Sequence, residues 1–209
     1  MYAPHAMLTS GTCWRGLDAT APICWRDDGS SKQRTVAVRG RSWRAGHDRL
    51  GAMKRLRVYA DTSVFGGCFD DEFSVESRRF FDEVRQGRFL LVVSEILLFE
   101  LRGAPLHVRE VLTKLPTEAV EVVENPEEVV ALRNAYLSVG ILTETSSQDA
   151  THVAAASVAD ADLIVSWNFK HIVHFEKIRG FHAVNLLKGY RMVEIYSPKE
   201  VVSLEEENI

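Results

Sequence analysis

The fold of this chain is decided by residues 56–67, LRVYADTSVFGG, a short run of β-forming residues that ends at an aspartate. The run predicts a buried strand that delivers Asp61 to its carboxyl end, followed by a turn at Gly66 and Gly67. In an open α/β sheet, ligands collect outside the carboxyl ends of the strands. Asp61 is therefore a candidate metal ligand, although an aspartate followed by Thr62 and Ser63 is equally suited to cap a helix.

Length and composition limit what this aspartate can belong to. The chain has 209 residues, of which 46% are hydrophobic and 26% charged, and this predicts one globular domain with a substantial core. No apolar run approaches the roughly eighteen residues that cross a bilayer, so we expect no membrane insertion. The three cysteines, Cys13, Cys24 and Cys68, are an odd number without metal-site spacing, which fits a reducing cytoplasm.

Residues 1–52 differ from the rest of the chain in composition and carry no sustained hydrophobic periodicity. We expect little stable structure there, and we expect residues 53–209 to form the folded domain. The segment has eight basic and four acidic residues, which leaves 17 basic and 25 acidic residues in the remainder. It is either a basic arm that contacts nucleic acid or translated upstream sequence ahead of a natural start at Met53, and we favour the second interpretation.

From residue 53 onward, strand-like and helix-like runs alternate, which predicts an α/β fold with a central parallel sheet flanked by helices. We expect helices at residues 74–86, 95–102, 106–115, 127–140 and 148–158, with Ser74 and Ser94 as N-caps. Further strands are expected at residues 89–94, at 161–171 and from 193, the last leading into a helix at Ser197 and Pro198. A helix near Phe175 and a separate short segment at residues 183–187 precede that last strand. Residues 117–123 fit either a strand or a solvated connector.

A second candidate ligand lies inside the expected helix at residues 95–102. Glu100 is flanked there by Leu98, Phe99 and Leu101. A carboxylate among apolar neighbours is costly to bury unless it is paired or coordinates a cation. Glu95 lies in the first turn of the same helix, where the helix dipole alone explains an acid, so we do not count it as a ligand.

Two later stretches carry further oxygen ligands. Asp149 begins the helix at residues 148–158, where it is either a cap or a metal ligand. His152 lies three residues on, on the same helical face, and either hydrogen-bonds near the site or is a satisfied structural histidine. The apolar run that follows ends in Ser166 and Asn168, which repeats the order of strand, hydroxyl and side-chain oxygen seen around Asp61.

Taken in this order, residues 56 to about 202 resemble the PIN-domain nucleases, and among them the VapC-like toxins of prokaryotic toxin–antitoxin pairs and their stand-alone relatives. The resemblance rests on VYADTS at residues 58–63, on VS at 93–94 with Glu100 and Leu101 six residues later, on DATHVAAA at 149–156, and on LIVSWNFKH at 163–171.

The resemblance implies a three-layer α/β/α fold in which acidic side chains converge at the carboxyl edge of the sheet and hold Mg²⁺ or Mn²⁺. Asp61, Glu100 and Asp149 match the family's carboxylates, and Ser166 takes the family's usual hydroxyl position. We also count Thr62, Ser63 and His152 as supporting residues of the site. Asn168 stands where many members have a fourth aspartate, so the site has one negative charge fewer and is expected to bind a second cation less well. The implied activity is hydrolysis of RNA phosphodiester bonds, and the implied partners are RNA, a protein antitoxin and a second copy of the chain.

The ligand types favour the same chemistry. Three carboxylates and an amide oxygen suit Mg²⁺ or Mn²⁺ and not zinc, which prefers His and Cys. Such a cation stabilises the charge that develops during attack on phosphorus, so phosphodiester hydrolysis is its natural use. An acidic domain that grips a polyanion needs basic groups near the cleft. Lys170 and His171 are the candidates for contacting substrate, with Arg78 and Arg79 as further basic groups, unless these residues form a solvated face.

Two other classes of function fit the sequence less well. A nuclease-like protein that has lost turnover and binds RNA or a protein partner is suggested by Asn168, and divalent-dependent RNA cleavage would distinguish it from an active enzyme. A nucleotide-binding domain is disfavoured, because the DTSVFGG that follows the first strand is neither a GxGxxG fingerprint nor a P-loop.

Overall fold

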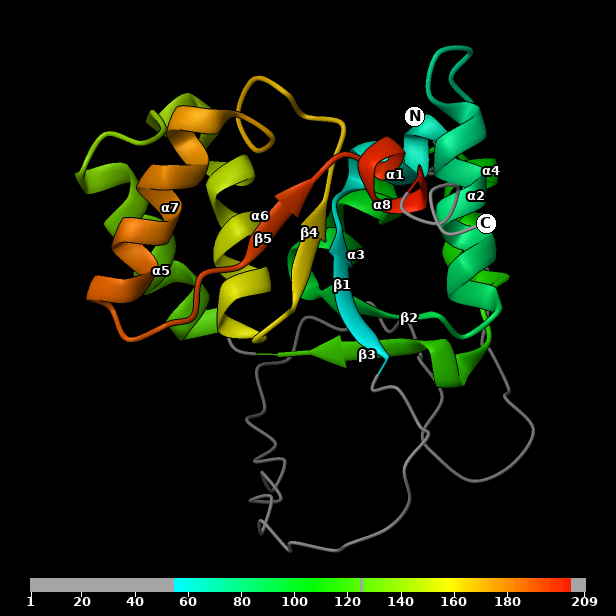
Figure 1. Cartoon of the computed structure of the whole chain (residues 1–209), viewed down its shortest axis with the longest axis horizontal. Coiled ribbons are helices and arrows are strands. Elements are labelled where there is room, and N and C mark those ends of the chain that lie inside the picture. Colours follow the sequence, from blue (N-terminus) through cyan, green and yellow to red (C-terminus); the bar gives the residue numbers. More distant parts are fainter. Residues whose placement is uncertain (1–54, 125, 204–209) are drawn as a thin grey trace, which may run out of the picture. The chain divides into compact units, whose positions relative to one another are not determined.

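The computed structural model describes residues 55–124 and 126–203, and these form an α/β fold around a parallel sheet (Figure 1). The sheet has five strands in the order β3-β2-β1-β4-β5. Their bounds are Leu56–Ala60 for β1, Phe89–Ser94 for β2, Val120–Val123 for β3, Leu163–Val165 for β4 and Glu194–Tyr196 for β5. Every neighbouring pair is parallel. The predicted fold class, a central parallel sheet flanked by helices in three layers, is confirmed.

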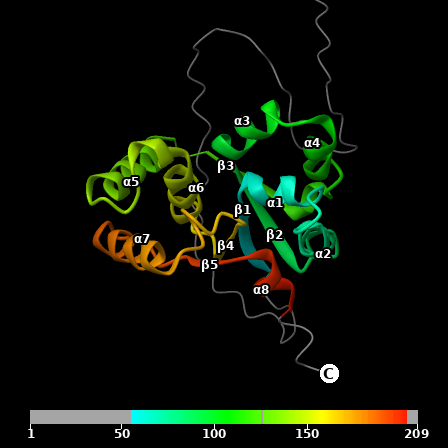
Figure 2. The same cartoon turned by 90° about the horizontal axis from the view of Figure 1, so that it is seen from above.

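Helices cover both faces of the sheet (Figure 2). One face carries α1 (Thr62–Gly67), α2 (Ser74–Arg85), α3 (Glu95–Gly103), α4 (Leu106–Thr113) and α8 (Pro198–Ser203). The other face carries α5 (Pro126–Ser138), α6 (Ser147–Val158) and α7 (Phe175–Leu187). Two short 3-10 turns, η1 (Thr117–Ala119) and η2 (Glu144–Ser146), precede β3 and α6.

The inner strands β1, β2 and β4 are largely apolar because each of them contributes side chains to two cores. Val58 and Ala60 point into the core beneath α1 to α4, whereas Tyr59 between them points into the core beneath α5 to α7. The same alternation holds for Leu91 and Val93 against Val92 in β2. Successive side chains of a strand point to opposite faces of the sheet, so a parallel sheet that is buried on both faces needs side chains at every position that are apolar or hydrogen-bonded within the protein.

The strand order reverses direction between β1 and β4. The chain moves from β1 outward to β2 and β3, and then returns to the other side of β1 to form β4 and β5. The carboxyl ends of these two strands are level, because Ala60 is opposite Val165 and the Asp61 N–H donates to the Val165 carbonyl at 3.3 Å. Asp61 and Ser166 therefore lie side by side at the switch point, where open α/β sheets bind ligands.

The predicted turn at Gly66 and Gly67 is wrong, because α1 continues through both residues. A Cβ atom on Gly67 would lie 2.6 Å from the Ser77 hydroxyl and 2.9 Å from the Trp167 indole nitrogen. This glycine serves close packing and not a turn. The predicted N-cap at Ser74 is also wrong, since Ser74 is the first residue of α2 and Phe73 occupies the cap position. The ring of Phe73 stacks on Trp167. Ser94 is confirmed as a cap and accepts a hydrogen bond from the Leu97 N–H at 3.4 Å.

Three further boundaries differ from those expected. The chain from Phe175 to Leu187 is a single helix, not a helix and a separate segment. Gly180 in its middle allows close packing, because a Cβ there would lie 2.9 Å from the Ile141 side chain. Strand β4 ends at Val165, and residues 166–171 cross the carboxyl edge of the sheet as a loop. Residues 117–123, which fitted either a strand or a connector, form η1 and the edge strand β3.

Within residues 55–124 and 126–203, no helix is long and apolar enough to cross a membrane. The prediction that residues 1–52 have little stable structure falls outside the part of the chain that the structure describes, as do Cys13 and Cys24. Cys68 is a free, buried cysteine, and burial raises the pKa of its thiol to about 11.

Candidate active site

A cleft of about 660 Å³ opens at the carboxyl edge of the sheet, which faces the viewer in Figure 2. Its walls come from the start of α1, the end of α3, the start of α6 and the loop after β4. Seven of the residues singled out from the sequence line it: Asp61, Thr62, Ser63, Glu100, Asp149, His152 and Asn168. An eighth, Ser166, is fully buried beneath Asp61. Lys170 and His171 lie in the same loop but do not line the cleft.

Asp61 is almost completely buried, with 4% of its surface exposed. It occupies the N-cap position of α1, but its side chain makes no capping hydrogen bond. Its two carboxylate oxygens instead accept from the hydroxyls of Ser63, at 2.5 Å, and Ser166, at 2.8 Å. Burial raises the pKa of Asp61, and the nearby His152 and these two hydroxyls offset only part of that shift. A bound cation would stabilise the charged form of this carboxylate.

The same hydroxyls tie the loop after β4 to the start of α1. The Ser166 Oγ accepts from the Asn168 N–H at 2.9 Å while donating to Asp61. The Ser63 Oγ accepts from the Trp167 N–H at 2.9 Å while donating to the other oxygen of Asp61. The orientation of the buried carboxylate is therefore fixed from two segments about a hundred residues apart in sequence.

Asp149 lies in the first turn of α6 and is not its cap, since the cap position is Ser146. Its Oδ1 accepts a hydrogen bond from the Asn168 side-chain amide at 2.8 Å. The Asn168 Oδ1, which the sequence analysis assigned to a cation, accepts from the His171 N–H at 3.0 Å. With its oxygen engaged in this way, Asn168 turns its NH₂ group towards Asp149 and positions that carboxylate.

Glu100 is held by two hydrogen bonds to one oxygen. Its Oε2 accepts from the Thr62 hydroxyl at 2.8 Å and lies 2.9 Å from the His152 Nε2. Burial alone would raise the pKa of Glu100, but the hydrogen bond and charge of His152 and the hydroxyl of Thr62 outweigh it and lower the pKa. The other oxygen, Oε1, receives no hydrogen bond from any residue that the structure describes, and neither does the Oδ2 of Asp149. Each of these two acids thus keeps one oxygen available to a ligand.

A buried chain of hydrogen bonds lies behind Glu100. The Tyr59 hydroxyl is 2.8 Å from both the His152 Nδ1 and the Ser94 Oγ. Because the Ser94 Oγ already accepts from the Leu97 N–H, its own proton is used best on the Tyr59 oxygen. The Tyr59 proton then goes to the His152 Nδ1, which leaves the Nε2–H to donate to Glu100. This assignment gives every donor in the chain of hydrogen bonds an acceptor.

Tyr59 is not among the site residues predicted from the sequence. The available signal was a hydroxyl on a strand that is buried on both faces, since a buried tyrosine hydroxyl needs a hydrogen-bond partner. Its partner His152 is 93 residues away in sequence, so the contact itself could not be derived.

The basic groups near the cleft belong to the loop after β4 and to α7. Lys170 is exposed, and Lys177 donates both to the Lys170 carbonyl, at 2.7 Å, and to the His171 Nδ1, at 3.0 Å. Partial burial and the Lys177 and Lys170 ammonium groups lower the pKa of His171, against the pull of Asp149. This shift favours the neutral imidazole at pH 7. Arg78, expected as a further basic group, donates to the carbonyl of Cys68, the residue that follows α1.

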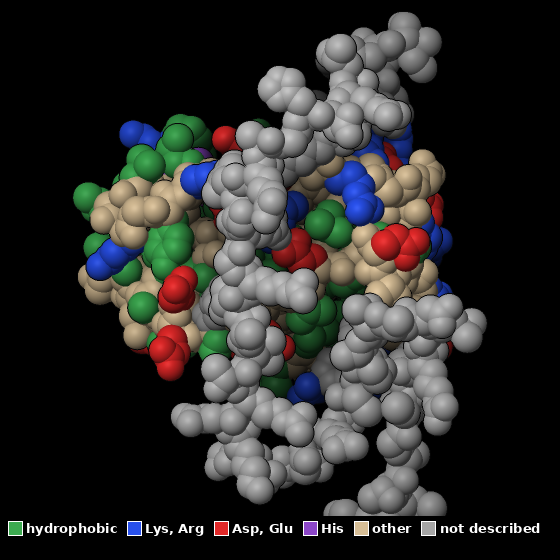
Figure 3. Space-filling view, turned by 90° about the horizontal axis from the view of Figure 1, so that it is seen from below, with side chains coloured by type: hydrophobic (Ala, Val, Ile, Leu, Met, Phe, Trp, Pro, Cys, Tyr) green, Lys and Arg blue, Asp and Glu red, His purple; other side chains and the backbone are tan. Residues whose placement is uncertain are grey.

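Acidic side chains at the two edges of the sheet have different kinds of partner. At the amino edge they are paired with arginine: Arg57 with Glu121 at 3.0 Å, and Arg191 with Asp160 and Asp162. Figure 3, seen from below, shows basic and acidic side chains interspersed on this side. At the carboxyl edge, none of the three cleft carboxylates forms an ion pair with a lysine or arginine among the described residues, and their partners are hydroxyls, an amide and His152.

The chain matches no known protein-family model and no curated protein.

The donor set of the cleft fits a hard divalent cation. Carboxylate and hydroxyl oxygens suit Mg²⁺ or Mn²⁺, whereas zinc would need more nitrogen or sulfur. Within residues 55–124 and 126–203, no three His, Cys, Asp or Glu side chains converge closely enough to form a metal centre as they stand. The three acids line one cleft, and sharing one cation would require Glu100 and Asp149 to rotate towards Asp61, whose carboxylate is held by two hydroxyls.

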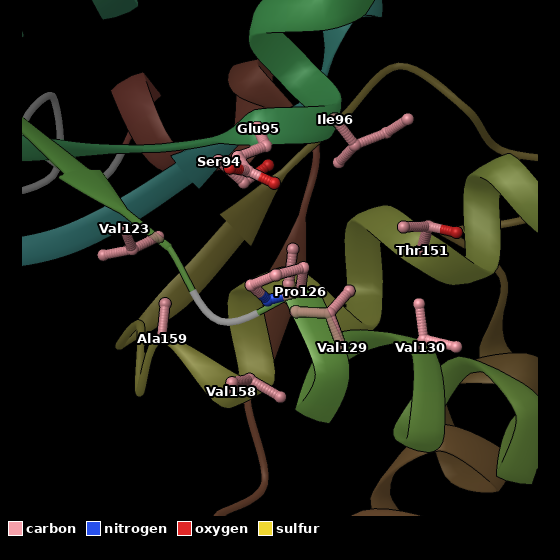
Figure 4. Close-up of a pocket in the computed structure, with 11 residues that line it drawn as sticks. Ser94, Glu95, Ile96, Val123, Pro126, Val129, Val130, Thr151, Val158 and Ala159 are labelled. Atoms are coloured by element: carbon pink, nitrogen blue, oxygen red, sulfur yellow. The ribbon is translucent and has the colours of Figure 1, made fainter. Parts of the chain in front are cut away.

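A second hollow, of about 120 Å³, lies between α3, β3, α5 and α6 (Figure 4). It is lined mainly by Ile96, Val123, Val129 and Val158. Among the described residues that line it, Glu95 is the charged one. An apolar hollow of this size offers nothing to a phosphodiester. Glu95 lies here and does not line the acidic cleft, in line with its exclusion as a ligand.

Proposed function

We propose that this chain is a divalent-cation-dependent ribonuclease, with Asp61, Glu100 and Asp149 as the carboxylates that hold the cation. One observation carries the proposal: three carboxylates without lysine or arginine partners among the described residues line a single cleft at the switch point of the sheet. Hydrolysis of phosphodiester bonds is the reaction that such a donor set suits best. The choice of RNA rests on the resemblance to the PIN-domain nucleases.

When bound, Mg²⁺ or Mn²⁺ supplies charge that polarises a phosphate oxygen and lowers the pKa of water. The residues of the chain supply preorganisation. Ser63 and Ser166 fix the orientation of Asp61, so that this carboxylate need not reorganise during the reaction. Thr62 and His152 hold one oxygen of Glu100, and Asn168 holds one oxygen of Asp149, so that the other oxygen of each acid can turn to the cation.

Counting charge at the site favours one tightly held cation. Three carboxylates neutralise a divalent ion and leave one excess negative charge, whereas a fourth carboxylate would leave two. Asn168 supplies a hydrogen-bond donor to Asp149 where a fourth aspartate would repel it. In the free protein we therefore propose one tight site, with any second cation recruited mainly by substrate phosphate.

Cleavage of end-labelled RNA by the full-length chain in Mg²⁺, Mn²⁺ or EDTA tests the proposal. Cleavage is expected with either cation and not in EDTA, and Asp61→Asn or Asp149→Asn should reduce it by about 100-fold or more, since each removes one charge that stabilises the transition state. Asp162→Asn is the matched control, because Asp162 is a half-buried carboxylate at the amino edge that accepts from the Arg57 N–H. Unchanged rates in the folded Asp61 and Asp149 variants would reject the ligand assignment.

A second candidate function is binding of RNA or a protein partner without turnover. The observation in its favour is Asn168, whose oxygen is committed to the His171 N–H and whose amide replaces a fourth acid. RNA binding without cleavage in any divalent cation would support this function over the first. A toxin role, a protein antitoxin and a homodimer rest on the resemblance alone.

A further inference from the structure

Three aromatic side chains form a continuous cluster beside the cleft. The ring of Phe73 stacks on Trp167 with 4.4 Å between centroids and 26° between planes. Trp167 in turn contacts Phe169, with 6.0 Å between centroids and a 57° tilt. Trp167 is only partly buried, and Phe169 is 49% exposed. The cluster therefore ends in an aromatic surface that faces solvent and not the core.

The cluster is rigid at its centre. The Trp167 indole N–H donates to the Ser77 hydroxyl at 2.8 Å, and the Trp167 backbone N–H donates to the Ser63 hydroxyl at 2.9 Å. Gly67 leaves room for the ring, since a Cβ there would lie 2.9 Å from the indole nitrogen. Helices α1 and α2 thus hold the tryptophan in one orientation, and a ring held in this way loses little conformational entropy when a ligand stacks on it.

The aromatic surface is continuous with the acidic cleft and with positive charge. Asn168, between the two aromatic residues in sequence, lines the cleft and donates to Asp149. The exposed Lys170 follows Phe169 in the chain, and the Lys177 ammonium lies 2.7 Å from the Lys170 carbonyl, so two lysines adjoin the Phe169 end of the cluster. Aromatic rings beside cations are the combination with which proteins bind single-stranded nucleic acid without sequence preference.

We propose that Trp167 and Phe169 form a stacking platform for unpaired bases of single-stranded RNA, with Lys170 and Lys177 holding the adjoining phosphates. This inference rests on the proposed function for its choice of RNA, and it adds that the substrate is unpaired next to the cleaved bond. In a duplex, every internal base is already stacked on both faces and cannot reach the platform. A purely apolar partner would use the rings but would have no use for the two lysines.

Fluorescence anisotropy of the full-length chain in EDTA, with a labelled unstructured RNA and a labelled RNA duplex of equal length, tests the platform without cleavage. Phe169→Ala is expected to weaken binding of the single strand by about 5- to 150-fold and to leave duplex binding unchanged. Phe169→Leu should weaken it similarly, and Phe169→Tyr should retain it, because stacking needs a ring and not merely apolar volume. Phe175→Ala is the matched control, since Phe175 is an exposed phenylalanine on α7 outside the cluster.

The platform is overturned if the single strand binds equally to the wild type and Phe169→Ala, if Phe169→Leu binds like the wild type, or if no RNA binds at all. Equal weakening of single-strand and duplex binding also overturns it, since that result indicates a nonspecific change. The two proposals fail separately. Ring-dependent binding without cleavage in Mg²⁺ or Mn²⁺ keeps the platform and rejects the nuclease, and cleavage without ring-dependent binding does the opposite.

Discussion

Replacing Tyr59 with phenylalanine removes one oxygen atom from the centre of the hydrogen-bond chain behind Glu100. Tyr59 is fully buried, and its hydroxyl bonds both the His152 Nδ1 and the Ser94 Oγ at 2.8 Å. The substitution leaves the Ser94 hydroxyl proton without its acceptor and the His152 Nδ1 without its donor. Each such buried group costs about 1–3 kcal/mol, so we expect the free energy of unfolding to fall by about 2–6 kcal/mol. For a domain of this size the corresponding drop in Tm is about 4–24 °C.

The activity should fall as well, for a local reason. Without the Tyr59 proton on Nδ1, nothing holds His152 in the tautomer that donates from Nε2 to Glu100. Glu100 then keeps the Thr62 hydroxyl but loses its fixed bond to His152, and we expect kcat for RNA cleavage to fall by about 10- to 100-fold at saturating Mn²⁺, as when other residues that orient metal ligands are removed. Denaturant unfolding measures the first effect, and single-turnover cleavage of labelled RNA measures the second.

Tyr136→Phe is the matched control. The Tyr136 hydroxyl is also fully buried and bonds Asn185 at 2.5 Å and Ser157 at 3.4 Å, in the core formed by α5, α6 and α7. It should cost a similar free energy of unfolding and leave kcat unchanged at a temperature where both variants are folded. Equal losses of kcat in the two variants, or wild-type stability in Tyr59→Phe, would refute the reasoning.

Two further predictions concern the charge of the site. Burial raises the pKa of Asp61 above its ordinary value of 3.8, so the folded protein keeps the Asp61 proton to a higher pH than the unfolded chain does. The free energy of unfolding therefore falls as the pH rises from the pKa of the unfolded chain through the pKa of the folded protein. Asp61→Asn should therefore raise Tm at pH 7 in EDTA, and a lower Tm there would contradict the assignment. Asn168→Asp puts a second charge where the amide now donates to Asp149 at 2.8 Å. It should lower Tm in EDTA and enlarge the rise in Tm on adding Mn²⁺; a thermal-shift response equal to that of the wild type would show that the two side chains do not share a cation.

The sheet and the placement of the acids could be predicted because they depend on local patterns. The apolar run at residues 89–94 required a strand buried on both faces, and an acid directly after a strand lies at the carboxyl edge whatever the rest of the chain does. The same reasoning placed Asp61 and Ser166 at one edge. It required only that their strands be parallel and level.

What could not be predicted depends on contacts distant in sequence. Gly67 looked like part of a turn, but it is glycine because Trp167, a hundred residues later, packs against it. Gly180 lies inside a helix for the same kind of reason, through Ile141. Whether Asn168 turns its oxygen or its nitrogen towards the cleft depends on the His171 N–H, which is placed by the path of the loop and not by any sequence period.

Calorimetric titration of the full-length chain with Mn²⁺, with RNA cleavage measured at each Mn²⁺ concentration, tests whether a cation held by the carboxylates of the cleft drives the reaction. We predict one tight ion per chain, a cleavage rate that rises with its occupancy, loss of both in Asp61→Asn and retention of both in Asp162→Asn. Cleavage that persists in EDTA, or that is undiminished in an Asp61→Asn protein unable to bind Mn²⁺, would contradict a cation held by these three carboxylates as the source of the activity.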